Sequence, residues 1–386
     1  MRVPIAACVA LVAVLLQRPD AHAIPRFAVR EGLPCMACHV NPSGGGMRNR
    51  YGRYVFAPTE LAAKISLAGK RPLEADIGDT LSFGADARTA YIEQRVPDKT
   101  DLGTIFQMQS DLYVAAHLFQ GLTLYYDRGS YGSFEAISLY EFPLGTAGNS
   151  AYVKAGRFMP TYGLRLENHN LFVRQDIGFG PRDKDVGLEV GTYLGPFLLQ
   201  ASVLDGMSED RRTDDNRDKA VLFRGEFLWR GSALRLMTGG SVFYNQTGAL
   251  TKLATSEVDS RSRHLRFGAH LGIGLGRFAY LGEADVVKVD PFAGNKDGKE
   301  EFSFQSFQEL DVLLFRGLDL NLTYEFREPD LDLKSGRLHR LGGGIELYPI
   351  PYAELKLLYR HSIGSGPSME EQDGAKEFIA MAHLFY

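Results

Sequence analysis

The sequence predicts an all-β fold, a 16-stranded antiparallel transmembrane β-barrel with a short N-terminal haem-binding segment as its plug. Three features of residues 80–386 support this fold: segments of alternating polarity, an alternation of long and short connections along the chain, and a last strand that ends on an aromatic residue. After residue 23, no apolar run approaches the about 20 residues that a transmembrane helix needs. We therefore expect strands to cross the membrane.

Alternating polarity is clearest in residues 318–327, where leucine and aromatic side chains alternate with polar ones. The same pattern recurs in residues 221–230, 264–273 and 353–360. A strand with one apolar face also fits a soluble β-sandwich. The connections favour the barrel, because seven short turns and eight long polar connections alternate along the chain and delimit sixteen strands.

The connections also predict an orientation. An even number of strands returns the chain to its starting side and puts every long connection on one rim. Outer-membrane barrels have short periplasmic turns and long external loops, so we expect the outer membrane of a Gram-negative bacterium, with lipid around the strands and both termini periplasmic. The last strand, from Phe378 to Tyr386, is similar to the terminal assembly signal of such barrels. A soluble β-sandwich or propeller, the alternative, does not readily explain the alternation.

The chain divides into four parts. Residues 1–23 contain an apolar run and an Ala-x-Ala cleavage site, which predict a secretory signal peptide. Residues 24–58 are too few to bury a core without a cofactor or a neighbouring element, and they form the expected haem-binding segment. Residues 59–79 are the expected linker and residues 80–386 the barrel. The formal net charge of −4 and the lack of a basic run argue against a nucleic-acid partner.

The motif from Cys35 to His39, C-x-x-C-H, predicts one covalently bound haem c. Two thiols at this spacing add to the two vinyl groups of haem, and the next residue, His39, supplies the proximal iron ligand. Cys35 and Cys38 are the only cysteines that remain once residues 1–23 are removed. The alternatives are a redox C-x-x-C motif, which needs a βαβ context, and half of a zinc site, which needs further ligands nearby.

The sixth iron ligand is predicted to be Met47, the only methionine soon after His39. Thioether ligation raises the haem potential, and the glycine-rich stretch 41–46 is flexible enough to fold back across the ring. Alternatively, Met47 faces solvent or packs on the barrel, and the sixth ligand is a distant histidine or none. The histidines that the alternation places on the inner face are His117, His264, His270 and His383.

Residues 156–185 form the longest connection and the one richest in arginine and aromatic residues. Long ordered loops are often functional, and one that folds inward would narrow a channel. Its arginines, which would then face anions, are Arg157, Arg165, Arg174 and Arg182. A solvated external loop is the alternative. No nucleophile elbow, phosphate loop or catalytic-triad pattern occurs.

The inner face is expected to carry mixed charges. Among them, Glu309, Asp311 and Asp319 would either take up a metal cation or pair with arginines on the inner face, and we expect the pairing.

The order of signal peptide, C-x-x-C-H motif and 16-stranded barrel resembles the fused monohaem cytochrome–porins of the outer membrane. The best-known members are iron-oxidising outer-membrane cytochromes. Cys35, Cys38 and His39 match the haem motif, and Tyr51 to Phe56 is similar to the aromatic-Gly-x-x-aromatic segment that follows it in that family. Residues 156–165 are similar to a segment of phosphate-type porins.

The resemblance implies an outer-membrane electron-transfer conduit. It would pass electrons between an extracellular donor or acceptor, with Fe(II) one possible donor, and a periplasmic c-type cytochrome. Whether the chain is an Fe(II) oxidase stays open, because its residues would bind and position the haem without making bonds on a substrate. One alternative is a passive porin for small solutes or anions, with the haem segment as a structural plug. Another is a soluble periplasmic haem protein.

Overall fold

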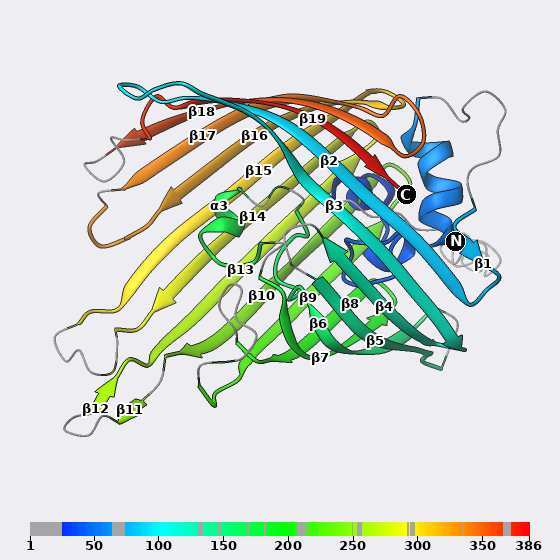
Figure 1. Cartoon of the computed structure of the whole chain (residues 1–386), viewed down its shortest axis with the longest axis horizontal. Coiled ribbons are helices and arrows are strands. Elements are labelled where there is room, and N and C mark those ends of the chain that lie inside the picture. The colour runs from blue at the N-terminus through cyan, green and yellow to red at the C-terminus, as the bar shows by residue number, and fades with distance from the viewer. Residues whose placement is uncertain are drawn as a thin grey trace, which may run out of the picture.

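Sixteen antiparallel strands close into a barrel in the computed structural model (Figure 1). The structure describes residues 25–63, 74–129, 134–145, 148–166, 168, 170–180, 183–206, 214, 216–248, 250–252, 257–291, 293, 298–334, 336–365 and 372–386. The expected signal peptide, residues 1–23, lies outside these residues.

Each barrel strand pairs with its neighbours in chain order. The strands are β2 (Leu81–Arg95), β3 (Leu102–Phe119), β4 (Leu122–Gly129), β5 (Phe134–Pro143), β6 (Ser150–Phe158), β7 (Asp185–Leu194), β8 (Phe197–Leu204), β9 (Ala220–Arg230), β10 (Leu234–Thr247), β13 (Ser262–Leu275), β14 (Phe278–Val289), β15 (Glu301–Phe315), β16 (Leu318–Glu328), β17 (Arg337–Leu347), β18 (Ala353–Ser365) and β19 (Lys376–Phe385). The barrel closes between β19 and β2, where Lys376 lies opposite Arg95 and Phe385 opposite Asp86. The predicted strand number is confirmed. The order of long and short connections differs at one place, because residues 130–133, between β4 and β5, are fewer than residues 144–149, between β5 and β6.

Side chains alternate between the outside of the barrel and its interior, which we call the lumen. In β8, Phe197 and Leu199 are exposed, whereas Leu198 and Gln200 are buried. Charged side chains such as Glu189 are buried although they lie on strands. This inverted arrangement, apolar outside and polar inside, is that of a barrel surrounded by lipid.

Three further strands lie outside the barrel. Strand β1 (Asp76–Ile77) falls in the expected linker and pairs with β2. Strands β11 (Leu250–Lys252) and β12 (Glu257–Asp259) form a small hairpin within the connection between β10 and β13.

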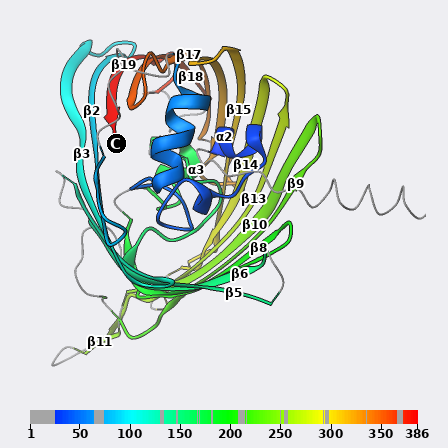
Figure 2. The ribbon, with the colours of Figure 1, turned by 90° about the vertical axis from the view of Figure 1, so that its right-hand side faces the viewer.

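The N-terminal segment lies in the lumen and at one end of it, where part of the π-helix η2 (Gly52–Leu61) is exposed (Figure 1). It comprises the helix α2 (Pro25–Glu31), the short 3₁₀ helix η1 (Cys35–Ala37) and η2, which continues past residue 58. Figure 2 shows α2 within the curve of the strands, together with α3 (Phe172–Gln175) from the connection between β6 and β7. We call residues 25–61 the plug.

The strand β13 has glycines where α2 approaches it most closely. A Cβ atom at Gly272 would lie 2.4 Å from a methyl group of Val29, and one at Gly274 would lie 2.5 Å from the Val29 carbonyl oxygen. Any larger residue at either position would collide with the helix, so these glycines let the plug pack directly on the barrel wall.

Candidate functional site

Two arginines of α2 hold the plug against the inner wall. The guanidinium of Arg26 donates to Glu346 Oε1 at 3.2 Å and lies 3.8 Å from Asp311, and Arg30 Nη2 lies 2.6 Å from Asp319 Oδ1. Burial alone would lower the pKa of Arg26, but Glu346 and Asp311 outweigh it and raise that pKa well above its ordinary value. The plug is therefore held by ion pairs that are shielded from water.

These contacts decide whether Glu309, Asp311 and Asp319 bind a metal cation or pair with arginines. Glu309 lies 3.8 Å from Arg26, so this residue and its two neighbours Asp311 and Asp319 all face plug arginines. Within the described residues, no group of three or more His, Cys, Asp or Glu is arranged to hold a metal ion. Pairing with arginine is confirmed, but Arg26 and Arg30 come from the plug and not from neighbouring strands.

The C-x-x-C-H residues lie on the plug, in the barrel interior. Cys35 begins η1, and Cys38 and His39 follow it with exposures of 3% and 7%. No disulfide joins the two cysteines. Cys38 belongs to an apolar cluster, and Cys35 packs against that cluster. The other members of the cluster are Phe27, Phe56, Leu61, Tyr348 and Phe385.

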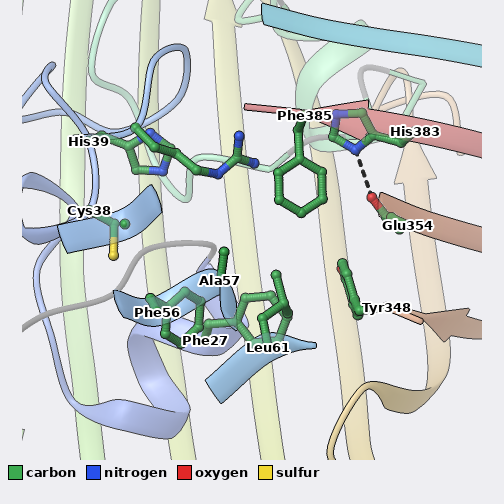
Figure 3. A pocket seen from close by; sticks show the side chains of 12 residues that line it. Phe27, Cys38, His39, Phe56, Ala57, Leu61, Tyr348, Glu354, His383 and Phe385 are labelled. Carbon is green, nitrogen blue, oxygen red and sulfur yellow. Dashed lines mark hydrogen bonds and ion pairs between the residues drawn. The ribbon is translucent and has the colours of Figure 1, made fainter. Parts of the chain in front are cut away.

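A cavity of about 400 Å³ opens beside Cys38 and His39 (Figure 3). The residues of the apolar cluster line it from the plug and from the wall, together with Arg48 and His383. A second cavity, of about 520 Å³, lies beside Cys35 and is lined by Arg165 and Glu226 among others.

The residues present fit a covalently bound haem. Two thiols two residues apart contact one apolar cluster, and an imidazole follows beside a cavity with aromatic walls. Burial raises the pKa of Cys35 to about 11, with Glu226 acting in the same direction and Arg224 and Arg165 against it. The Cys35 thiol is therefore protonated at neutral pH, as expected of a cysteine that serves no thiolate chemistry of its own.

The glycine-rich stretch after His39 is fixed to the lumen wall. The Ser43 hydroxyl donates to Glu189 Oε1 at 3.1 Å and accepts from Lys154 Nζ at 2.7 Å. Lys154 and Glu189 themselves form a fully buried ion pair of 2.7 Å, and Thr161 donates to Ser43 at 3.0 Å. Residues 41–46, predicted to be flexible, are thus hydrogen-bonded through Ser43 to β6, β7 and the connection between them.

Met47 lies away from His39. His39 pairs with Arg48 in an antiparallel bridge, so these two side chains share one face and Met47 points to the other. Met47 is fully buried among wall residues that include Tyr113, and its N–H donates to Tyr125 Oη at 3.2 Å. The structure does not bring Met47 and His39 together, and ligation by Met47 stays a prediction that requires this turn to rearrange.

Of the four inner histidines, His383 lines the cavity that contains Cys38 and His39. Its Nδ1 lies 2.8 Å from Glu354 Oε2 (Figure 3). The others lie elsewhere in the barrel. Their partners are Thr123 for His117, Thr247 for His264 and Glu226 for His270.

The long connection between β6 and β7 folds inward, as predicted. Arg174 of α3 donates from Nη1 to Glu283 Oε1 at 2.8 Å and from Nη2 to Oε2 at 2.6 Å, and the Phe172 N–H donates to Glu325 at 3.0 Å. Next to them, the rings of Tyr162 and Phe179 stack with centroids 4.4 Å apart.

The expectation that the arginines of this connection face anions is not met at Arg174, which is 1% exposed and neutralised by Glu283. Arg157 stacks over the Phe134 ring, and Arg165 lies 3.7 Å from Glu135. Arg182 lies outside the described residues.

Arg48 and Glu354, which line the cavity beside Cys38 and His39 together with His383, were not predicted from the sequence as site residues. Both were visible only as members of charged patterns, Arg48 in an arginine-rich stretch and Glu354 on an inner strand face. Their proximity depends on the closure of the barrel around the plug, which no local pattern expresses.

None of the described helices is long and apolar enough to cross a membrane. No family model matches the chain, and no curated protein matches it.

The fold is similar to those of solved outer-membrane proteins. OmpT of Vibrio cholerae is 13% identical with a TM-score of 0.54, covering 82% of this chain and 100% of its own. An anion-selective porin from Comamonas acidovorans is 12% identical with a TM-score of 0.56, covering 80% and 99%. The outer-membrane channel DcaP of Acinetobacter baumannii is 11% identical with a TM-score of 0.52, covering 79% and 97%. At such identities the likeness shows the fold alone: this chain is a porin-like β-barrel of the Gram-negative outer membrane.

Proposed function

We propose that the barrel carries one haem c in its plug and passes electrons across the outer membrane. Cys35 and Cys38 would hold the haem through thioether bonds, and His39 would be its proximal ligand. The observation that carries the proposal is the position of Cys38 and His39 inside the barrel, beside a cavity with aromatic walls, with Cys35 packed against the same apolar cluster. The resemblance of the motif and of Tyr51 to Phe56 to fused cytochrome–porins supports it.

The haem would supply one-electron redox chemistry, and the protein would bind it and shield it from water. Phe27, Phe56 and Tyr348 exclude water from the space next to Cys38. Arg26 and Arg30 keep the plug seated, so that the haem position is fixed relative to the wall. Electrons would pass between an extracellular donor or acceptor, Fe(II) included, and a periplasmic c-type cytochrome.

Haem staining of the outer-membrane fraction after denaturing electrophoresis tests the covalent attachment. The wild-type band is expected to stain, and Cys38→Ala to lose most of its stain, because a single thioether holds the haem less well through maturation. A wild-type band without stain would refute the haem assignment. Proteoliposomes that contain an entrapped redox dye test the conduit: external reductant should reduce the dye only when the haem-loaded protein is present.

A passive diffusion channel is the second candidate, favoured by the likeness of the fold to porins, one of them anion-selective. It predicts that liposomes with the protein swell in small sugars or in salts of small anions, and that the entrapped dye stays oxidised. The inward loop and plug, both fixed by buried ion pairs, favour slow swelling.

A further inference from the structure

We propose that Arg48 binds a propionate carboxylate of the haem. The inference rests on the proposed function, because it assigns a partner to a residue of the same cavity. It concerns a residue outside the C-x-x-C-H motif, one that the bridge with His39 places on the haem side of the turn.

Arg48 projects into the cavity beside His39. Its guanidinium carbon lies 4.1 Å above the centre of the Phe385 ring, which belongs to the cavity wall. The side chain is 15% exposed, so its charge is largely removed from water. A buried cation is costly unless an anion accompanies it.

The one carboxylate that forms an ion pair with Arg48 in the described residues, that of Asp86, makes no hydrogen bond with it. Arg48 Nη1 lies 3.5 Å from Asp86 Oδ1, and this buried nitrogen makes no hydrogen bond. Asp86 also has other partners, because Tyr113 donates to it at 2.8 Å and His383 Nε2 lies 3.5 Å from it. Arg48 is thus a buried guanidinium that shares its one carboxylate partner with two other side chains and lines the cavity beside His39.

Haem brings two carboxylates, and a planar guanidinium is the side chain best suited to bind one, through paired N–H donors. A haem joined to Cys38 and ligated by His39 would share the cavity with Arg48, the residue opposite His39 in the bridge. A propionate there would neutralise Arg48 and would be neutralised by it.

The effect is measurable because thioether bonds retain the haem when Arg48 is replaced. In Arg48→Gln the haem stain should persist, and the midpoint potential should fall, because removing a cation favours the oxidised, more positive haem. We expect about a tenfold change in the reduction equilibrium, equal to 59 mV for one electron. Arg48→Lys should recover part of the shift. The control Arg50→Gln, an exposed arginine paired with Asp76 and Asp79, should leave the potential unchanged.

A second measurement separates binding of the propionate from a role through Asp86. Redox-induced infrared difference spectra report the propionate carboxylate stretching bands. In an Asp86→Asn background, Arg48→Gln should still move a propionate band and lower the potential; unchanged bands and potential there would overturn the proposal. A wild-type protein without haem stain would refute the proposed function as well, whereas a stained protein indifferent to Arg48→Gln and Arg48→Lys would refute this inference alone.

Discussion

The guanidinium of Arg174 and the carboxylate of Glu283 form a bidentate ion pair inside the barrel, and both side chains are at most 1% exposed. The pair joins the inward connection to β14 on the opposite side of the lumen. It is one of several contacts that hold this connection in the barrel interior, beside those of Thr161 with Glu189 and of the Phe172 N–H with Glu325.

Replacing one partner of this pair should release the connection. In Arg174→Ala, Glu283 keeps a buried charge without its counterion, which costs about 3–5 kcal/mol. The connection should move outward, and liposome swelling by small solutes should become faster. The control is the double variant Arg174→Met/Glu283→Leu, which removes both charges. Its midpoint of urea unfolding should be close to that of the wild-type protein. Equal stability of the single and the double variant would contradict the argument.

The turn before Met47 should tolerate no side chain at Gly46. That glycine has φ of +61°, and a Cβ atom there would lie 2.3 Å from Tyr125 Oη. Gly46→Ala should lower the free energy of unfolding by about 1–3 kcal/mol, because strain adds to the clash. Gly195→Ala is the matched control, since Gly195 has φ of +58° but no atom within 4 Å of the added Cβ. Urea unfolding in detergent compares the two, and equal losses would show that the contact with Tyr125 has no effect.

Substitution of Met47 tests the predicted sixth ligand. With the bridge between His39 and Arg48 intact, Met47 points away from the haem side, so Met47→Leu should leave the visible and paramagnetic resonance spectra of the haem unchanged. The apolar swap should cost less than about 1.5 kcal/mol of stability. A change of axial-ligand signature on Met47→Leu would show that the turn rearranges and that the sequence prediction is right.

Loss of Arg26 should loosen the plug. Because Asp311 would then lose its arginine and Glu346 would keep only its ion pair with Lys356, Arg26→Gln should favour states in which α2 leaves the wall. Added protease should cut the N-terminal segment faster in this variant than in wild type. The exposed Arg50→Gln serves again as control, and equal cutting of all three proteins would contradict a role of Arg26 in seating the plug.

The barrel was predictable because its signal is local and repeated. In residues 318–327 the leucines face outward or pack at the wall while Asp319, Asn321 and Glu325 are buried in the lumen, as the alternation predicts. Strand number followed from connection lengths. The alternation cannot predict what fills the lumen, since it assigns an inner face to Asp319 without identifying Arg30, the plug residue that it binds.

The candidate site was predictable only in its covalent part. Cys35, Cys38 and His39 form a contiguous motif with one dominant chemistry. Arg48 and His383 reach the same cavity from positions 335 residues apart, a distance that only the closed barrel bridges. The assignment of Met47 depended on a flexible turn, and Ser43 shows the missing constraint, because its hydroxyl is fixed by Lys154 and Glu189.

The seam between β2 and β19 has a consequence for biogenesis. Its partners, such as Lys376 and Arg95, lie nearly the whole barrel apart in sequence, so the ring cannot seal until the final segment has been exported. The plug is made first and enclosed last. Cys38 is almost inaccessible once it is enclosed, so a maturation enzyme that acts on this thiol has to reach it during that interval.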